Sequence, residues 1–283
     1  MVTWQDLVEI NERKSDRDKI QFVFMLINTH KNTREYEDAL VAVEYAKQRN
    51  KTIMDYQKLL YTMTGKAVPD NYSANYKLAS NFFYRFVTQQ NQYLLGNGIS
   101  WNNDDTKELL GDSFDNEVQK AGYNALVSGV SFGFWNLDHL DVFTLQEFAP
   151  LYDEENGALM AGVRFWQLDK SKPMRATLYE PDGYTDYVWD GEGQILHEKR
   201  PYILKIRSSQ IDGDEIYDGA NYPSFPIVPL WGNQHKQSEL TGLRSEIDAY
   251  DLIKSGFAND LDDASQIYWI VQNAGGLDDV DLA

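Results

Sequence analysis

Histidine side chains are the usual starting point in a search for acid–base or metal chemistry, and this chain has four. No two of them stand four residues apart, the spacing that places two imidazoles on one helix face to hold a metal ion. An imidazole acts as a metal ligand only together with partners. We therefore interpret all four as structural or solvent-exposed side chains: His30, His139, His197 and His235.

Two acidic segments have the composition of calcium-binding loops, residues 153–157 (DEENG) and residues 212–219 (DGDEIYDG). A calcium loop of the EF-hand type needs alternating Asp or Asn ligands, then a glycine, and later a bidentate Glu. Neither segment has this spacing. Hairpin turns on an acidic protein are the better interpretation of both.

Paired carboxylates beside aromatic platforms would be the chemistry of a glycoside hydrolase. Trp135, Trp166 and Trp189 could form such platforms, but tryptophans in strands are more often core or interface residues. None of the 44 Asp and Glu residues is singled out by its surroundings. An acidic carbohydrate-active or metal-dependent enzyme is therefore kept as an alternative function, without an assigned residue.

Two glycine-containing segments do not match catalytic motifs. Residues 95–98 (LGNG) follow a predicted helix, whereas a phosphate-binding loop precedes one. Residues 128–133 (SGVSFG) lack the order of the G-x-S-x-G nucleophile elbow. We therefore predict no catalytic, cofactor-binding or metal-binding residue, and no enzymatic activity.

The composition predicts a soluble, non-secreted protein with a substantial core. The chain has 283 residues, 42% of them hydrophobic, enough for one large or two modest domains. It contains no cysteine, which excludes disulfides and thiolate metal sites, and no apolar run of membrane-spanning length. The net charge of −18 disfavours a sequence-specific nucleic-acid binder, because such a protein needs a basic surface. A wall past which DNA slides, or simple solubility, is compatible with this charge.

The periodicity along the chain predicts an α+β fold whose first part is helical. Helical patterns cover much of residues 4–65, and a break follows at residues 65–71. Further helices are predicted at Tyr72–Leu95 and Phe114–Val127, with a short strand at Ile99–Trp101 between them.

Alternation with a period near two then predicts an antiparallel β region of about 100 residues. Turn signals such as Pro181-Asp182-Gly183 separate its strands. The predicted strands are residues 130–138, 143–148, 160–168, 174–180, 184–189, 195–204 (with Pro201 at an edge or bulge) and 227–230, and a last strand is expected at residues 266–272.

The segment Phe225–Leu261 joins an apolar strand to a long amphipathic helix. Apolar residues recur at steps of three, four or seven, so they form one stripe. We expect this stripe to seat the helix on the β region and on the Tyr72–Leu95 helix, and the opposite charged face to be free. The stripe contains Leu240, Leu243, Ile247, Tyr250, Phe257 and Leu261, and the charged face contains Glu239, Arg244, Glu246, Asp248, Asp251, Lys254 and Asp260.

These elements suggest five consecutive parts of the chain. They are an N-terminal helical region (1–70), a helical core (71–129), an antiparallel β-rich module (130–233), a long helix plus strand (234–272) and an acidic end (273–283).

Four segments, taken in order, resemble the portal (head–tail connector) proteins of tailed bacteriophages, particularly those of siphophages and prophages of Gram-positive hosts. Residues 91–99 (NQYLLGNGI) are similar to a helix end of that family, and residues 124–135 (NALVSGVSFGFW) to its helix-to-strand step. Residues 148–153 (FAPLYD), followed by residues 161–166 (AGVRFW), form the third match. The fourth and most specific is Phe225–Leu261, with its PLWGN and IDAYD sequences.

This resemblance implies the wing portion of a subunit in a closed ring, usually of about twelve copies. Such a ring forms the channel at one capsid vertex through which DNA is packaged and ejected. The implied partners are further copies of the chain, the terminase large subunit, the major capsid and scaffolding proteins, a head-completion adaptor and double-stranded DNA passing without sequence specificity. No cofactor, metal or membrane is implied.

The resemblance also implies a location, which is the virion, with the host bacterial cytoplasm during assembly. In the family the chain continues into stem, clip and crown parts, which we expect to follow residues 273–283. Another virion adaptor protein that shares the wing architecture is an alternative within the same class.

Overall fold

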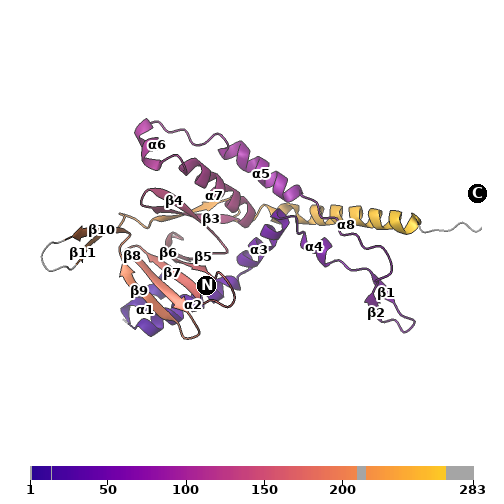
Figure 1. The fold of residues 1–283 in the computed structure, drawn as a ribbon, viewed down its shortest axis with the longest axis horizontal. Helices are drawn as coiled ribbons and strands as arrows, with labels where there is room; N and C mark the ends of the chain where they lie inside the picture. The colour runs from indigo at the N-terminus through magenta and orange to yellow at the C-terminus, as the bar shows by residue number, and fades with distance from the viewer. Residues whose placement is uncertain (1, 14, 209–214, 266–283) are drawn as a thin grey trace, which may run out of the picture. The chain divides into compact units, whose positions relative to one another are not determined.

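The structure is a computed structural model that describes residues 2–13, 15–208 and 215–265. Helices and antiparallel strands are both abundant in these residues, which confirms the α+β prediction (Figure 1). None of the helices described there is long and apolar enough to cross a membrane.

The chain divides into two compact units, each built from two separate stretches of sequence. Unit 1 consists of Met1–Gln48 and Asn81–Arg244, and unit 2 consists of Arg49–Ser80 and Ser245–Ala283.

Short polar side chains cap the starts of two helices of unit 1, α2 and α3. The Ser15 hydroxyl accepts a hydrogen bond from the Asp18 amide, and the Thr33 hydroxyl accepts one from the Tyr36 amide, both at 3.3 Å. These contacts satisfy amides that have no partner inside the helix. The unit 1 helices are α1 (Trp4–Glu12), α2 (Asp16–Lys31), α3 (Arg34–Ala46), α5 (Phe82–Leu95), α6 (Asp104–Leu110) and α7 (Phe114–Ser128).

The strands of unit 1 form antiparallel sheets. The largest is a five-stranded meander in the order β5-β6-β7-β8-β9, and a three-stranded sheet has the order β12-β3-β4. A separate hairpin pairs β10 with β11. The strands are β3 (Val130–Asn136), β4 (His139–Thr144), β5 (Phe148–Tyr152), β6 (Leu159–Trp166), β7 (Met174–Glu180), β8 (Gly183–Trp189), β9 (Gln194–Arg200), β10 (Ile203–Ser208), β11 (Glu215–Ala220) and β12 (Ile227–Trp231).

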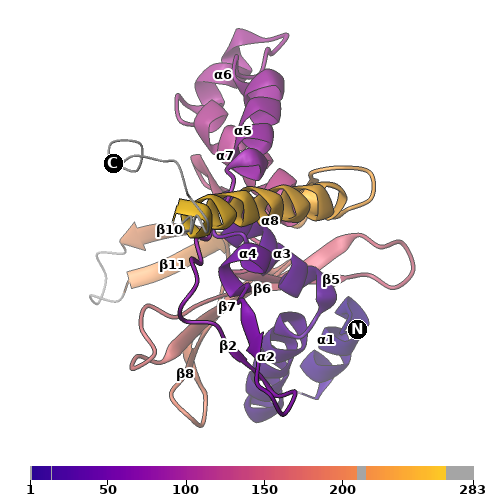
Figure 2. The same ribbon diagram turned by 90° about the vertical axis from the view of Figure 1, so that its right-hand side faces the viewer.

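Two apolar clusters hold these layers together. In the first, Leu7 of α1 and Val23 of α2 pack against Leu151 and Val163 of the five-stranded sheet, all with no exposed surface. The second is aromatic and joins the two sheets, with Phe132 and Phe148 at its centre. Figure 2 shows α1 and α2 beside the larger sheet, and α5 beside α7.

Phe148 explains one glycine in the sheet. Its ring lies over Gly162, where an added Cβ atom would come within 2.1 Å of the Phe148 ring. The ring also packs against Phe132, with 4.6 Å between the ring centroids. Gly162 therefore gives the ring the space that it needs to reach the inter-sheet core.

Unit 2 contains a short helix, a small hairpin, an extended segment and most of the long helix. The short helix α4 spans Lys51–Asp55, and β1 (Leu59–Tyr61) pairs antiparallel with β2 (Ala67–Pro69). The long helix α8 spans Leu240–Ser265 and enters unit 2 at Ser245.

Several predicted elements are confirmed. The helix predicted at Phe114–Val127 is α7, and the strand predicted at residues 174–180 is β7. The strands predicted at residues 130–138 and 160–168 are β3 and β6, with slightly different ends.

The helix predicted at Tyr72–Leu95 is wrong in its first ten residues, because α5 begins only at Phe82. Before it, alternate backbone amides are engaged by side chains of α8, so they are not available to a helix. Within α5, Phe83 and Val87 are buried, whereas Phe86 and Leu94 are 47% and 62% exposed.

Three strand predictions are also wrong. Ile99–Trp101 is not a strand, and the Ile99 amide donates to the Asp115 carboxylate of α7 instead. Residues 143–148 contain the turn between β4 and β5, closed by the Glu147 amide on the Thr144 carbonyl. Residues 195–204 contain two strands, since β9 ends at Arg200, before Pro201, and β10 begins at Ile203. The strand predicted at residues 266–272 lies outside the described residues.

Candidate interaction site on helix α8

The histidines have the structural or solvent-exposed positions predicted for them. His30 is 8% exposed and its Nε2 lies 2.8 Å from the Leu145 carbonyl, and burial lowers its pKa. His139 is on the surface, where its hydrogen bond to Asp138 raises its pKa. Among the described residues, no three His, Asp or Glu side chains are grouped as a metal ion would require.

The acidic segment at residues 153–157 is a turn, as predicted. One carboxylate oxygen of Asp153 accepts hydrogen bonds from the amides of Glu155 and Asn156, at 2.7 and 3.3 Å. This Asx turn connects β5 to β6. In the other acidic segment the predicted hairpin turn is wrong for residues 215–219, which belong to strand β11 (Glu215–Ala220), and residues 212–214 lie outside the described residues.

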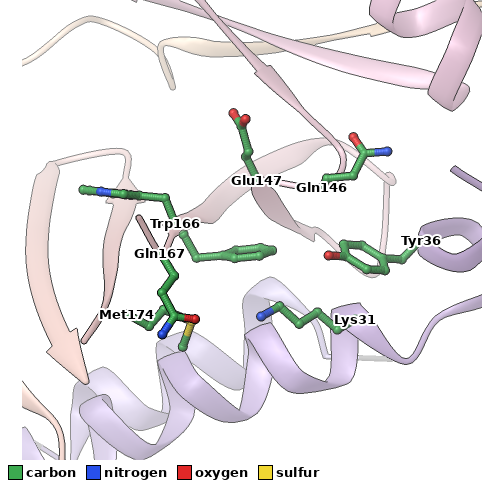
Figure 3. Close-up of a pocket in the computed structure, with 8 residues that line it drawn as sticks. Lys31, Tyr36, Gln146, Glu147, Trp166, Gln167 and Met174 are labelled. Carbon is green, nitrogen blue, oxygen red and sulfur yellow. The ribbon is translucent and has the colours of Figure 1, made fainter. Parts of the chain in front are cut away.

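The hollows beside the tryptophans lack a carboxylate pair. A hollow next to Trp166 has Glu147 as its one lining carboxylate, and in Figure 3 that group points away from the amine of Lys31. The amine lies 5.0 Å from the centre of the Phe165 ring, and burial lowers its pKa. A second hollow next to Trp189 has Asp190 as its one lining carboxylate. Among the residues that the structure describes, neither hollow is lined by the two carboxylates that glycoside hydrolysis needs. The third tryptophan, Trp135, packs edge-on against Phe114.

The most unusual polar arrangement is in unit 2, where side chains of α8 bind a stretch of extended backbone. We call residues 74–80 the strap. Four α8 side chains accept hydrogen bonds from alternate strap amides. The pairs are Asp251 with Ser80 (2.8 Å), Ser255 with Leu78 (2.9 Å), Asn259 with Tyr76 (2.6 Å) and Asp263 with Ala74 (3.2 Å).

The four-residue spacing of the contacts on α8 matches their two-residue spacing on the strap because of elementary backbone geometry. Four residues along an α-helix advance by about 6 Å, since each residue adds about 1.5 Å. Two residues along an extended chain advance by roughly 6.6 Å. Each step of four along α8 therefore meets each step of two along the strap, and the strap runs antiparallel to the helix. We call this set of four contacts the ladder.

The ladder is buried over its first three contacts and bridged at both ends. Asp251 has no exposed surface, and Ser255 and Asn259 are 2% and 1% exposed. Asp251 also accepts a hydrogen bond from the side-chain amide of Asn50. At the other end, Asp263 forms an ion pair with Lys58 at 3.3 Å. Each terminal carboxylate thus uses one oxygen for the strap and one for a second segment of unit 2.

A separate carboxylate turns the chain into the strap. One oxygen of Asp70 accepts hydrogen bonds from the amides of Tyr72 and Ser73, at 2.9 and 3.1 Å. Hydrogen bonds from Ser73 and Tyr72 lower the pKa of Asp70. The turn therefore depends on an ionised Asp70.

The apolar stripe of α8 is buried at its start, as predicted, but exposed from Tyr250 onward. Its first residues, Leu240 and Ile247, are 3% and 4% exposed, but Tyr250, Phe257 and Leu261 are 44%, 71% and 65% exposed. Asp251, predicted on the free charged face, is fully buried. The helix prediction is right, and the predicted orientation is wrong from Tyr250 onward, because the strap supplies backbone amides that a polar face can bind.

The sequence contains a signal for this arrangement that the period of the apolar residues does not reveal. Short polar side chains with acceptor oxygens recur every four residues on α8, from Asp251 to Asp263. On a solvent-exposed helix the acceptor oxygens of such a row would bind only water. An extended segment with free backbone amides can donate hydrogen bonds to all of them. The ladder holds the backbone of the strap against the polar face of α8. The apolar face of the helix therefore points outward.

The four segments that carry the family resemblance lie at element junctions. Residues 91–99 end α5, and residues 124–135 lead from α7 into β3. Residues 148–153 form β5 and its turn, while residues 161–166 form the adjacent part of β6. The fourth segment, residues 225–261, contains β12 and the part of α8 that holds most of the ladder.

Comparison with known proteins gives a consistent family. The sequence profile described as "Phage portal protein, SPP1 Gp6-like" matches residues 27–283. The chain is 27% identical over 230 residues to the portal protein of Clostridium phage phiCD119, covering 73% of this chain and 49% of that protein. It is 23% identical over 263 residues to the portal protein of Bacillus phage SPP1, covering 85% and 50% respectively.

The chain thus spans about half the length of the curated relatives that it matches. The profile match covers nearly all of the chain, including both units and the whole ladder. This chain belongs to the family of SPP1 Gp6-like phage portal proteins, which are structural proteins of the virion.

Proposed function

We propose that this chain is a structural, non-enzymatic subunit of a phage portal ring at one capsid vertex. The profile match over residues 27–283 is the observation that carries the proposal. The outward apolar face of α8 supports it, since exposed apolar patches mark association surfaces. A ring subunit needs fixed surfaces rather than reactive groups, and the ladder supplies such a surface.

The ring would form the channel through which DNA enters and leaves the capsid. A net charge of −18 suits a channel that does not retain DNA, because phosphate neutralisation by Lys and Arg drives nonspecific binding. The channel would therefore pass double-stranded DNA without reading its sequence.

The proposed partners follow from that position at the vertex. They are further copies of the chain, the major capsid and scaffolding proteins, the terminase large subunit during packaging and a head-completion adaptor afterwards. Assembly would occur in the host bacterial cytoplasm, and the product would be a virion component.

Mass measurement and electron microscopy test the proposal directly. The protein is produced from its complete reading frame and examined by native mass spectrometry and negative staining over a wide concentration range. We expect closed rings of about twelve copies, because head-to-tail contacts close by rotation. A monomer at every concentration, with no rings in the micrographs, would refute the proposed ring for this protein.

A further inference from the structure

Unit 2 has a second exposed apolar surface besides α8. The β1–β2 hairpin joins strands of three residues each, and its apolar side chains are uncovered. Leu59, Tyr61 and Met63 are 50%, 73% and fully exposed. An isolated two-stranded hairpin is marginally stable in water. Its exposed side chains therefore indicate a surface that becomes covered on association.

The outward face of α8 is the other exposed apolar surface of unit 2. Ile253, Phe257 and Leu261 follow steps of four, are 72%, 71% and 65% exposed, and form one continuous row with Tyr250. We call this row the outward stripe. It lies roughly half a turn around the helix from the ladder, given 3.6 residues per turn.

The hairpin and the outward stripe lie on opposite sides of unit 2. The hairpin is tied to the ladder side, because Lys58, directly before β1, pairs with Asp263 at 3.3 Å. It stands off from α8 in both views (Figures 1 and 2). A hairpin held on the ladder side cannot cover the outward stripe of its own chain.

Two different apolar surfaces on opposite sides are what a head-to-tail contact requires. We propose that the β1–β2 hairpin of one copy packs on the outward stripe of α8 in the adjacent copy. This inference rests on the proposed ring and names the contact between its subunits. A symmetric contact between two α8 helices would close a dimer and would leave both hairpins uncovered.

The charges near the two surfaces are compatible with this pairing. Lys66 at the hairpin tip is exposed, and Glu246 and Asp260 are exposed beside the outward stripe. Lys254 lies on the other flank, with its amine 5.9 Å from the centre of the Tyr250 ring. Opposite charges at a rim chiefly orient the partners and speed their encounter.

The absence of cysteine from the chain makes disulfide trapping a clean test. A Tyr61→Cys protein is mixed with a Phe257→Cys protein under mild oxidation, and products are separated without reductant. We expect a covalent heterodimer from the mixture, and a series of larger multimers from the double variant. Homodimers of Phe257→Cys alone, or no product from the mixture, would overturn the proposed pairing.

A matched control uses an exposed apolar residue of unit 1. Leu168 is 89% exposed, so Leu168→Cys mixed with Tyr61→Cys measures random collision between exposed thiols. Cross-linking of this pair as fast as the Phe257 pair would also overturn the proposal. Both Leu168 and Phe257 are on the surface, so neither substitution should prevent folding.

A charge substitution separates this inference from the ring itself. Phe257→Asp should weaken subunit association at least tenfold, measured by native mass spectrometry against dilution, whereas Leu168→Asp should not. Rings that persist unchanged in Phe257→Asp would refute the hairpin contact and leave the portal assignment standing. No rings from the unmodified protein would refute the proposed ring itself.

Discussion

Unit 1 and unit 2 place their polar and apolar side chains in opposite positions. In unit 1 the sheets enclose an aromatic cluster around Phe132 and Phe148, neither of which is exposed. In unit 2 the buried side chains of α8 include Asp251, Ser255 and Asn259, and the apolar row faces outward. The first arrangement is complete within one chain. The second leaves an apolar surface uncovered in the residues that the structure describes.

This difference separates two ways of holding backbone in place. Apolar burial is non-directional and roughly proportional to area, so unit 1 gains most of its stability from its core. Hydrogen bonds from side chain to backbone are directional and contribute about 1 kcal/mol each. In unit 2 the ladder therefore fixes the position of the strap more than it adds to stability. The following predictions test this contrast between the two units.

The largest effect is expected in the core of unit 1. Phe148→Ala should lower the free energy of unfolding by about 3–5 kcal/mol, because it removes a fully buried ring and leaves a cavity. Denaturant titration followed by tryptophan fluorescence measures the change. Leu168→Ala, at an exposed site, should alter it by less than about 0.5 kcal/mol. A small effect of Phe148→Ala would show that the inter-sheet cluster is not the main core.

The next effect is expected at the Asp251 end of the ladder. Asp251→Ala should destabilise unit 2 by about 3 kcal/mol, since it leaves the buried Ser80 amide without an acceptor and removes one of the two acceptors of the Asn50 side-chain amide. Hydrogen exchange of the strap amides reports this local opening. Asp260→Ala, on the exposed side of the same helix, is the control. Equal exchange in both variants would contradict the ladder as the element that holds the strap.

A smaller effect is expected from the loss of one rung of the ladder. A substitution at the next residue should change the stability in the opposite direction. Ser255→Ala should raise the exchange rate of the Leu78 amide, corresponding to about 1 kcal/mol. Gly256→Ala should stabilise α8 by about 0.5–1 kcal/mol, because an added Cβ there meets nothing within 4 Å. If Ser255→Ala and Gly256→Ala both stabilised this region, helix propensity, and not the ladder, would govern its stability.

The smallest effect concerns the turn at Asp70. Hydrogen bonds to its carboxylate hold its pKa below the unfolded value of about 3.9. The turn therefore contributes stability above about pH 4, and this contribution is lost as the pH falls through the folded-state pKa. Amide chemical shifts of Tyr72 and Ser73 should follow this titration. In Asp70→Asn the same shifts should not titrate there, and an unchanged titration would assign it to another group.

The sequence predicted elements well where one residue pattern dominates. The alternation in residues 174–180 and the helical period of Phe114–Val127 each reflect burial on one face, so β7 and α7 were placed correctly. The identification of the portal family was also possible, because its motifs lie at helix-to-strand junctions.

The strap and the outward stripe could not be predicted in the same way. The period of Leu240, Ile247 and Phe257 shows that α8 is amphipathic but does not show which face is buried. Partners distant in sequence, here the strap amides, decide that question. The start of α5 at Phe82 was missed for the same reason, since a helical pattern from Tyr72 onward was overridden by contacts with α8.

The ladder has a consequence for how freely the strap can change its sequence. α8 holds the strap through backbone amides, so most side chains can replace one another at residues 74–80 without loss of these bonds. Proline is the exception because it has no amide hydrogen. At Ala74, Tyr76, Leu78 and Ser80 it would remove a rung. Among natural variants, proline should therefore be rare at these four positions.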